Sequence, residues 1–402
     1  MKLDPAPWQT QPGMAELLAA LDAPQGATRY VGGSVRDGLL GLPVGDVDLA
    51  TRLAPQEVID RLGGARIKAV PTGLAHGTIT AVLKNGPVEV TTLRRDVSTD
   101  GRRATVAFTD DWREDAARRD FTINALSADP LTLQVHDYFD GETDLAARRL
   151  RFIGDPLTRI AEDHLRILRF FRFHARFGEG EPDAASLEAC TARANDLMAL
   201  SRERIADELL KLLALPDSSP TLALMVERGI LRPVLPEIDE AGVERLRQLV
   251  ACETAAEAAP DPLRRLAALL PGDSAIAADV AARLRLSNKA AKRLVSAAGR
   301  GPDDSANPPA LAYRIGADEA ADRLLLIGAD PVLVRSLCDW HKPRFPLGGG
   351  DLIAMGLKPG PQVARTLQAV ERSWIDGGFS KDDGEVRRLA RAAVDQALRE
   401  SQ

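Results

Sequence analysis

Two aspartates one residue apart, Asp46 and Asp48, lie in the sequence YVGGSVRDGLLGLPVGDVDLAT (30–51) and could hold a metal ion. On an extended segment alternate side chains point to the same side, so both carboxylates should face one way while Val47 points into the core. Carboxylates held this close repel each other unless a divalent cation lies between them. Mg²⁺ prefers carboxylate and phosphate oxygens, so the pair predicts a magnesium site.

The glycine pair of the same segment predicts a place for an anion. Gly32 and Gly33 lie between an expected strand and an expected helix, and their backbone can approach an anion closely. The helix start at Ser34 adds free N–H groups and the positive end of a dipole, and Arg36 can reach the same anion. A phosphate cradle beside a metal site is expected for phosphoryl or nucleotidyl transfer. The alternative is a glycine turn with solvated charges, because the segment is neither a P-loop nor a dinucleotide fingerprint.

A second polar group, on the segment AEDHLRILRFFRFHARFG (161–178), could read a nucleotide base. Asp163, Arg166 and Arg169 recur at three-residue steps, which is typical of one helix face. Asp163 only accepts hydrogen bonds and Arg166 only donates them, so together they offer an edge that suits cytosine and adenine and opposes uracil and guanine. Each buried group left unpaired costs about 1–3 kcal/mol, which is enough for useful discrimination. The alternative is a surface salt bridge worth about 0–1 kcal/mol.

The composition narrows the class of protein. The 402 residues suggest several domains, and a hydrophobic content of 45% is ordinary for a globular protein. A net charge of −6 argues against a chain that coats nucleic acid along its whole surface. Residues 148–176, however, carry eight arginines against three acids, which suits a cleft for polyphosphate or RNA backbone.

Cysteine usage and hydropathy predict the compartment. The three cysteines, at positions 190, 252 and 338, form no C-x-x-C pair, so we expect no disulfide framework and a reducing, cytoplasmic environment. The N-terminus does not resemble a signal peptide. No apolar run approaches the ~18 residues of a membrane span, and we expect no membrane association.

The elements that must position these residues change in type along the chain. Up to about residue 150, TRYVGG, DVDLAT, GTITAVL and VEVTTL are short and rich in β-branched residues, so we predict strands there, with LQVHDYF as a further candidate. SVRDGLLG predicts a helix that ends at Gly41. Beyond residue 150 alanine- and leucine-rich helices dominate. The expected fold is α+β, a small mixed sheet with helices followed by an all-helical region.

Several segments in a fixed order resemble one known family. Besides the opening segment they are TGLAHGTIT (72–80), EVTTLRRD (89–96), RRDFTINAL (118–126), DYFDGETDL (137–145) and EDHLRILRFFRF (162–173), with GGGDLIAMGLKPGPQV near the C-terminus. Together they resemble the class II tRNA nucleotidyltransferases and bacterial poly(A) polymerases of the polymerase-β-like superfamily. Ordered blocks are far more specific than any single motif.

The resemblance implies magnesium-dependent, template-independent transfer of nucleoside monophosphates from CTP and ATP to the 3′ end of tRNA. It implies that Asp46 and Asp48 are catalytic metal ligands. Glu89 is similar to a third acidic position, and a surface carboxylate on a strand is an equal alternative. Asn124 is expected on the same helical face as Asp120, at i+4. The residues implied to bind the nucleotide are Gly32, Gly33, Arg36, Arg119, Asp120, Asn124, Asp163, Arg166, Arg169 and Arg172.

The resemblance also implies a domain order. We expect a lead segment (1–25), a nucleotidyltransferase head (26–150), a helical neck that recognises the base (151–215), a helical body (216–342) and a helical tail that contacts tRNA (343–402). The expected partners are tRNA, CTP and ATP, with no protein partner evident.

Within the family, full CCA addition is favoured. Poly(A) polymerases usually carry a basic, aromatic block where this chain has TGLAHGTIT, and enzymes that add only CC are reported to lack a flexible loop that RRDVSTDGRRATVAF (94–108) resembles. CC-only, A-only and poly(A) addition stay open as alternatives. An inactive RNA-binding relative is the alternative of another class, although an inactive site has no need to keep two repelling carboxylates.

Overall fold

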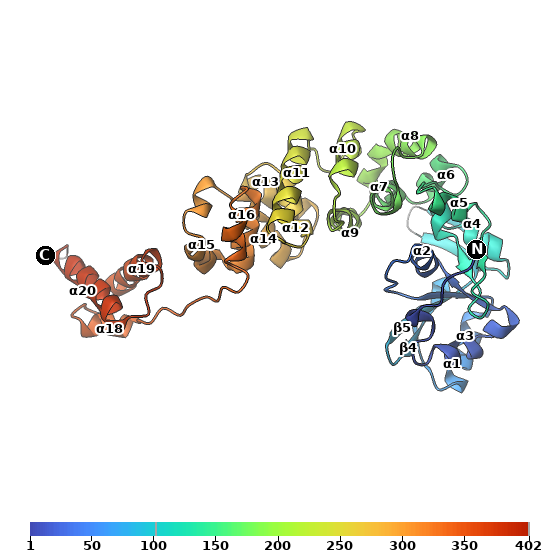
Figure 1. Cartoon of the computed structure of the whole chain (residues 1–402), viewed down its shortest axis with the longest axis horizontal. Coiled ribbons are helices and arrows are strands. Elements are labelled where there is room, and N and C mark those ends of the chain that lie inside the picture. The colour runs from blue at the N-terminus through green and yellow to red at the C-terminus, as the bar shows by residue number, and fades with distance from the viewer. Residues whose placement is uncertain (101–102, 401–402) are drawn as a thin grey trace. The chain divides into compact units, whose positions relative to one another are not determined.

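The computed structural model of the chain describes residues 1–100 and 103–400 and divides it into two units, Met1–Pro236 and Glu237–Gln402 (Figure 1). The first unit combines a sheet with helices, and its described elements beyond residue 150 are helical. The predicted α+β class is therefore confirmed, whereas the finer division into head, neck, body and tail stays a prediction. Among the described residues no helix is both long and apolar enough to cross a bilayer.

A seven-stranded mixed sheet organises the first unit, with the order β3-β4-β5-β2-β1-β8-β9. β2 and β5 run parallel, and the other neighbouring strands are antiparallel. The predicted strands are confirmed, whereas β3 and the two-residue β8 were not predicted; the β3 sequence KAVPTG contains proline and glycine, which strands disfavour. The strands are β1 (Thr28–Val31), β2 (Asp48–Thr51), β3 (Lys68–Gly73), β4 (Thr78–Leu83), β5 (Gly86–Thr92), β8 (Ser127–Ala128) and β9 (Val135–His136).

The two faces of this sheet differ in what covers them. One face carries buried apolar residues such as Leu49, Ile79 and Val90, and the helices α1 (Met14–Ala20) and α3 (Pro55–Gly64) pack on that side. The alternating burial along β4 and β5 places polar residues on the other face. Strand alternation thus separates a core face from a face that is free to carry chemistry.

Two short helices lie beside the sheet face that carries Asp48 and Glu89, called the chemical face below. α2 (Gly33–Leu39) follows β1 directly, and Gly41 with φ 66° lies just beyond its end, so the predicted helix and its stop are confirmed. α4 (Trp112–Ala117) places the buried Trp112 in a cluster with Val31 of β1 and Ala50 of β2. Both helices therefore lie beside β1 and β2, next to the aspartates.

The segment predicted as a flexible loop contains a β-hairpin. β6 (Arg94–Asp100) and β7 (Arg103–Phe108) form a separate antiparallel pair, with a bulge between Asp96 and Ser98. Residues 101 and 102 of that predicted loop lie outside the described residues. The β-branched RATVAF sequence fits a strand, and this local signal was outweighed by the resemblance to a loop.

The helical region after the sheet contains a break between α6 and α7, which the spacing of apolar residues did not predict. α6 (Pro156–Glu162) ends at Asp163, whose φ of −154° and ψ of 107° are extended, and α7 begins at Leu165. The segment 161–178, on which one helix face was predicted, therefore contains the end of α6, a break at Asp163 and the whole of α7. The helices of this region are α5 (Gly141–Ala146), α6, α7 (Leu165–Phe177), α8 (Ala184–Ala192), α9 (Arg202–Leu213) and α10 (Ser219–Glu227).

An aromatic cluster joins α7 to the sheet region. The ring of Phe121 lies 4.9 Å from Phe152 and 5.3 Å from Phe173, and Phe152 lies 5.7 Å from Phe170. All four side chains are buried. Such pairs add about 0.5–1.5 kcal/mol beyond the area they bury, so this cluster fixes α7 against the sheet region.

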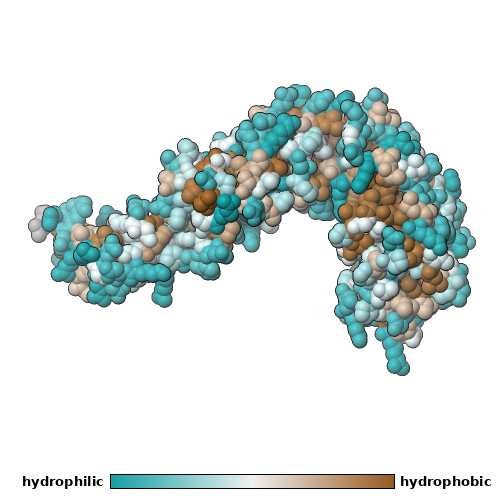
Figure 2. Space-filling model, in the orientation of Figure 1, coloured by the Kyte–Doolittle hydropathy of each residue, from teal (hydrophilic) through white to brown (hydrophobic). Residues whose placement is uncertain are grey.

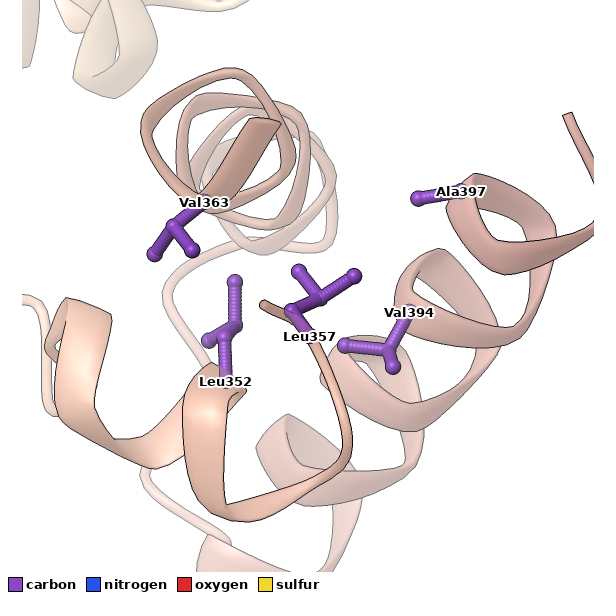
Figure 3. Close-up of a cluster of buried hydrophobic side chains, with 5 residues drawn as sticks. All are labelled: Leu352, Leu357, Val363, Val394 and Ala397. Atoms are coloured by element: carbon purple, nitrogen blue, oxygen red, sulfur yellow. The ribbon is translucent and has the colours of Figure 1, made fainter. Parts of the chain in front are cut away.

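The described elements of the second unit are helical, and its last three α-helices have a small core of their own. Figure 3 shows Leu352 and Leu357 in the space between Val363 and Val394. The visible surface of α18–α20 is mostly hydrophilic, as expected when these apolar side chains lie between the helices (Figure 2). The helices are α11 (Glu240–Ala255), α12 (Pro262–Leu269), α13 (Ser274–Arg283), α14 (Asn288–Ala298), α15 (Pro308–Ile315), α16 (Ala317–Leu326), α17 (Pro331–Arg335), α18 (Gly349–Ala354), α19 (Pro361–Asp376) and α20 (Asp383–Arg399).

Candidate active site

Backbone pairing places two carboxylates side by side on the parallel strands β2 and β5. Asp48 is the first residue of β2, and its register partner on β5 is Glu89. Asp46 lies two residues earlier at an exposed bend, so the prediction that both aspartates belong to the strand is wrong. Val47 between them is buried, as predicted, because its side chain points to the core. The strand therefore orients Asp48 and Glu89, whereas Asp46 reaches the site from the preceding loop.

The three carboxylates share one electrostatic environment. Burial raises the pKa of Asp48 to about 6; the negative charges of Glu89 and Asp46 act in the same direction, and the positive charge of Arg119 opposes them. A carboxyl group with a raised pKa, close to other acids, is typical of a site that receives a cation. The sequence left open whether Glu89 lies near the aspartates. The pairing of β2 with β5 places it beside Asp48.

The donor set fits a hard divalent cation. In the described part of the chain no three His, Cys, Asp or Glu side chains lie close enough together to form a metal site from protein ligands alone. Mg²⁺ does not need such a cage, because it is commonly bound by one or two carboxylates and completes its shell with water and substrate phosphates. Asp46, Asp48 and Glu89 offer suitable oxygens, and their mutual repulsion would be relieved by a bound cation.

Gly32 forms the turn that carries the chain from β1 into α2. Its φ of 67° and ψ of −124° favour glycine, and a Cβ atom there would lie only 2.8 Å from Nη1 of Arg119. The Arg119 guanidinium also donates to the carbonyl of Asn124 at 3.3 Å. The absence of a side chain at Gly32 therefore lets Arg119 lie against the backbone, within electrostatic reach of Asp48.

Arg36, which was expected to reach the anion, has internal partners in the structure. Its buried side chain donates from Nε to Oδ1 of Asp37 at 2.8 Å and from Nη1 to Oδ1 of Asn124 at 2.5 Å. Its guanidinium also lies 4.1 Å from the centre of the Phe177 ring. These contacts connect α2 to α7, and a contact of Arg36 with phosphate stays a prediction.

Asp120, which follows α4, is connected to α7 through an ion pair with Arg169. Its Oδ2 accepts from Nε and Nη2 of Arg169 at 2.8 and 2.6 Å, and its Oδ1 accepts from Nδ2 of Asn124 at 2.9 Å. Burial alone would raise the pKa of Asp120, but the charge of Arg169 and the hydrogen bonds lower it below its usual value. Asn124 ends the short 3-10 helix η4 (Thr122–Asn124), so the predicted common α-helical face is wrong although the two side chains meet.

Glu208 of α9 organises the arginines of α7, and sequence reasoning missed it. Nε of Arg172 donates to Oε2 of Glu208 at 2.6 Å, and Nη1 of Arg169 lies 3.6 Å from Oε1. Glu208 is 4% exposed and lies on the same helix face as the buried Ile205 and Leu209. An acid on the apolar face of an amphipathic helix was the signal that could have identified it.

Asp163 and Arg166 lie close in sequence but are held by different partners. Asp163, in the break between α6 and α7, accepts from the N–H of Leu165 at 3.1 Å and from Nη2 of Arg204 at 2.7 Å. Arg166 donates to the carbonyl of Arg159 at 2.7 Å and also bonds the carboxylate of Glu162. The predicted single helix face is wrong, because Asp163 precedes α7.

Arg204 and Glu162 are therefore positioning partners that the sequence interpretation did not name. Glu162 was detectable from its i,i+4 spacing to Arg166. Arg204 was not, because it lies on α9, 41 residues from Asp163. The acceptor and the donor of the expected base-reading edge are each oriented by a separate ion pair.

Comparisons with known proteins cover both the sheet region and the helices. Residues 28–151 match the family described as "Poly A polymerase head domain", and residues 181–241 match "Probable RNA and SrmB-binding site of polymerase A". CCA tRNA nucleotidyltransferase 1, mitochondrial, of Danio rerio is 35% identical over 397 residues, covering 92% of this chain and 89% of that protein. The CCA-adding enzyme of Streptococcus gordonii is 34% identical over 405 residues, covering 95% and 97%.

A solved structure extends the likeness to the fold. The Bacillus stearothermophilus CCA-adding enzyme in complex with CTP aligns with a TM-score of 0.78 and 27% identity, covering 98% of this chain and 100% of that one. The likeness therefore includes the mixed sheet, the helices around α7 and the helical second unit.

Proposed function

Because the chain belongs to the class II family of CCA-adding tRNA nucleotidyltransferases, we propose that Asp46 and Asp48 hold a divalent metal and that Gly32, Arg119 and Asp120 border the nucleotide. The reaction is the addition of CCA to the 3′ end of tRNA from CTP and ATP. In each step the terminal 3′-hydroxyl attacks the α-phosphorus of the nucleotide, a new phosphodiester bond forms and pyrophosphate leaves. No nucleic-acid template takes part, so the protein itself selects the base.

One observation carries the assignment of roles. The negative charges of Glu89 and Asp46 both raise the pKa of Asp48, and Arg119, which lies against the backbone of Gly32, lowers it. Negative and positive groups arranged in this order suit a metal on one side and a polyphosphate on the other. A solvated surface cluster would not raise the pKa of Asp48 through burial.

A magnesium ion at this site would supply Lewis-acid stabilisation of charge developing on the phosphate and would favour ionisation of the attacking hydroxyl. Asp48 is fixed in direction by β2, and Asp46 and Glu89 approach it from a loop and from β5. The protein thus provides carboxylate oxygens from separate backbone segments. Glu89 serves as a third carboxylate in this proposal.

The nucleotide is held by a set of arginines that are already paired with acids. We assign Arg119, Arg169 and Arg172 to the triphosphate, with Asp120 and Glu208 holding the last two in place. Arginine suits this role because its planar guanidinium binds phosphate oxygens in a bidentate manner. Asn124 supports Asp120 and Arg36 through hydrogen bonds, and Gly33 starts the helix beside them.

Base selection is assigned to Asp163 and Arg166. Asp163 offers an acceptor fixed by Arg204, and Arg166 offers donors fixed by Glu162. A base with a donor opposite Asp163 and acceptors opposite Arg166 would satisfy both, as cytosine and adenine do. Uracil and guanine would leave buried groups unpaired, at about 1–3 kcal/mol for each group.

The decisive experiment supplies tRNAs that end before the tail, after CC and after CCA. Labelled CTP and ATP are given separately and together with magnesium, and the products are resolved by length. We expect two C additions from CTP, one A addition after CC, and no extension of tRNA ending in CCA. Continued A addition would indicate a poly(A) polymerase, and C addition alone would indicate a partial enzyme. No product and no pyrophosphate would indicate an inactive RNA-binding relative.

A matched pair of variants tests the metal assignment. Asp46→Ala should abolish incorporation of both nucleotides, because it removes a carboxylate that the proposal gives to the metal. Asp60→Ala is the control, since Asp60 is an aspartate of α3 bonded by Gln56. Full activity in Asp46→Ala would remove the metal assignment while leaving the family membership unaffected.

We also propose that the protein works in a reducing compartment, the cytoplasm. The three cysteines are free in the structure, which supports a reducing environment such as the cytoplasm. Some relatives are named as mitochondrial proteins, so fractionation of cells with detection of the native chain is the appropriate test.

A further inference from the structure

The chemical face of the sheet has a covered half and an open half. At β1 and β2 the buried Trp112 packs against Val31 and Ala50. On β5 and β4 the same face shows Glu89 exposed and Val82 41% exposed. The catalytic carboxylates therefore lie at the border between a covered region and an accessible strip of sheet.

Threonines line this open strip directly beside the carboxylates. The register pairs Thr80 with Glu89 across β4 and β5, and Glu89 with Asp48 across β5 and β2. Oγ1 of Thr80 lies 2.9 Å from Oγ1 of Thr72 on β3. In the next row, Oγ1 of Thr78 lies 3.3 Å from Oγ1 of Thr91. Two hydroxyl groups thus continue the row of polar groups that begins at the carboxylates, and two more lie in the next row.

A positive charge completes the strip. Lys68 on β3 is paired in register with Val82, so its side chain leaves the sheet on the same face as the threonines. Lys68 is exposed, and its amino group has freedom to follow a flexible ligand. Hydroxyls together with a lysine suit a sugar–phosphate backbone, because they bind ribose hydroxyls and phosphate oxygens without reading base edges.

The geometry of the reaction indicates from which side of Asp48 the RNA 3′ end arrives. Gly32 and Arg119, the groups assigned to the nucleotide, lie beside β1, on one side of Asp48 in the strand order. In-line displacement requires the attacking hydroxyl to enter opposite the leaving pyrophosphate. The β5-β4-β3 side of Asp48 is the side away from β1. The growing end of the RNA would therefore arrive across the threonines.

We propose that Thr72, Thr78, Thr80, Thr91 and Lys68 bind the sugar–phosphate backbone of the last nucleotides of the tRNA acceptor strand. This inference rests on the proposed function and adds the location of the RNA 3′ end. A surface that ignores base identity meets a requirement of the reaction, since the terminal nucleotide changes after every addition. The threonine strip holds any of these ends, while the bases of incoming nucleotides are selected elsewhere.

The test separates RNA binding from nucleotide binding. In the variant Thr78→Val/Thr80→Val/Thr91→Val each valine keeps the β-branched shape of threonine and removes only the hydroxyl. We expect KM for tRNA to rise about tenfold, as the loss of a few hydrogen bonds predicts, with KM for CTP and ATP unchanged. Lys68→Gln should raise KM for tRNA and reduce its dependence on salt concentration. Thr254→Val is the control, because the Thr254 hydroxyl donates within its own helix α11.

A binding experiment without turnover locates the RNA end independently. A tRNA that lacks CCA and carries a photoreactive 4-thiouridine at its 3′ terminus is cross-linked to the wild-type enzyme without nucleotides. We expect cross-links within residues 68–91, and reduced cross-linking in the triple valine variant at unchanged melting temperature. If the triple variant unfolds, Thr80→Val alone is used.

An unchanged KM for tRNA, or cross-links confined to other segments, overturns the threonine strip while CCA addition by the wild type persists. Failure of the wild type to extend any tRNA would instead overturn the proposed function. The two failures are therefore distinguishable.

Discussion

Asp48 and Glu89 lie opposite each other on the parallel strands β2 and β5, where backbone pairing holds two repelling carboxylates together. The next residues along these strands, Leu49 and Val90, are also register partners, and both are fully buried on the other face. The hydrophobic core thus fixes the register that brings the acids together. The repulsion is maintained by packing energy until a cation or a proton relieves it.

The pH dependence of catalysis should follow from this relationship. The pKa of Asp48 is raised to about 6, so at low magnesium concentration we expect kcat/KM to fall below pH 6 as the carboxylate becomes protonated. Glu89→Gln removes a negative charge that raises this pKa, and the acid limb should move to lower pH. Higher magnesium concentration should move it in the same direction, because metal and proton compete for the carboxylate.

The measurement is a pH–rate profile of C addition at two magnesium concentrations. Glu57→Gln is the control, since Glu57 is a glutamate of α3 that pairs with Arg61. An acid limb that stays in place in Glu89→Gln would contradict the proposed coupling of Glu89 to Asp48.

Stability should depend on pH through the same carboxyl group. The raised pKa means that the folded state binds the proton more tightly than the unfolded chain, so stability decreases as pH rises from about 4 through 6. Asp48→Asn removes this cost, and we expect it to stabilise the protein at pH 8 by on the order of 1–3 kcal/mol while abolishing activity. The difference from the wild type should vanish below pH 4.

Denaturant unfolding at pH 8 and at low pH measures this effect. Magnesium should raise the melting temperature of the wild type and have a smaller effect on Asp48→Asn, because ligands stabilise the state that binds them. A variant less stable than the wild type at pH 8 would show that Asp48 makes a favourable structural contribution instead.

The glycine pair offers a prediction with an internal control. Gly32→Ala should cost about 1–3 kcal/mol of stability and reduce activity, because the new Cβ meets Arg119 and the φ of 67° is strained for alanine. At Gly33, by contrast, the atom nearest to an added Cβ would be Nη2 of Arg36 at 3.7 Å, an ordinary contact. Gly33→Ala should therefore leave the melting temperature nearly unchanged. Equal effects of the two substitutions on melting temperature would count against a special role for the Gly32 backbone.

Base selection should weaken when the donor or the acceptor is removed. Arg166→Ala and Asp163→Ala should each reduce the preference for CTP over UTP by about tenfold, the factor expected for one unpaired hydrogen-bonding group. The readout is competition between labelled nucleotides in a single reaction. Arg193→Ala is the control, because Arg193 pairs with Asp196. Unchanged selectivity in both Arg166→Ala and Asp163→Ala would remove these residues from base recognition.

The local elements were predictable because their signals lie within a few residues. β-Branched runs identified β1, β4 and β5, and Gly41 identified the end of α2. Strands that were not predicted are β3, where Pro71 and Gly73 mask the strand signal, the two-residue β8, and the hairpin β6–β7, which was expected to be a loop. The start of β2 was placed two residues early, because the alternation of Asp46, Val47 and Asp48 also occurs in the loop that leads into a strand.

The partners of the site residues were not predictable, because they come from distant segments. Asp163 was expected beside Arg166 but is held by Arg204, and Arg172 is held by Glu208. Helical spacing describes neighbours on one helix and contains no information about the helix that packs against it. Arg36 illustrates the same limit, since its partner Asn124 lies 88 residues away.

The ring cluster of Phe121, Phe152, Phe170 and Phe173 has a consequence for protein engineering. A chimaera joined at residue 150 would separate Phe121 from the other three rings and give each parent half an interface shaped for a different partner. The helix α7 is therefore not an interchangeable unit. Transplanting α7 into a relative would require moving residues 118–177 together, so that the aromatic contacts are kept.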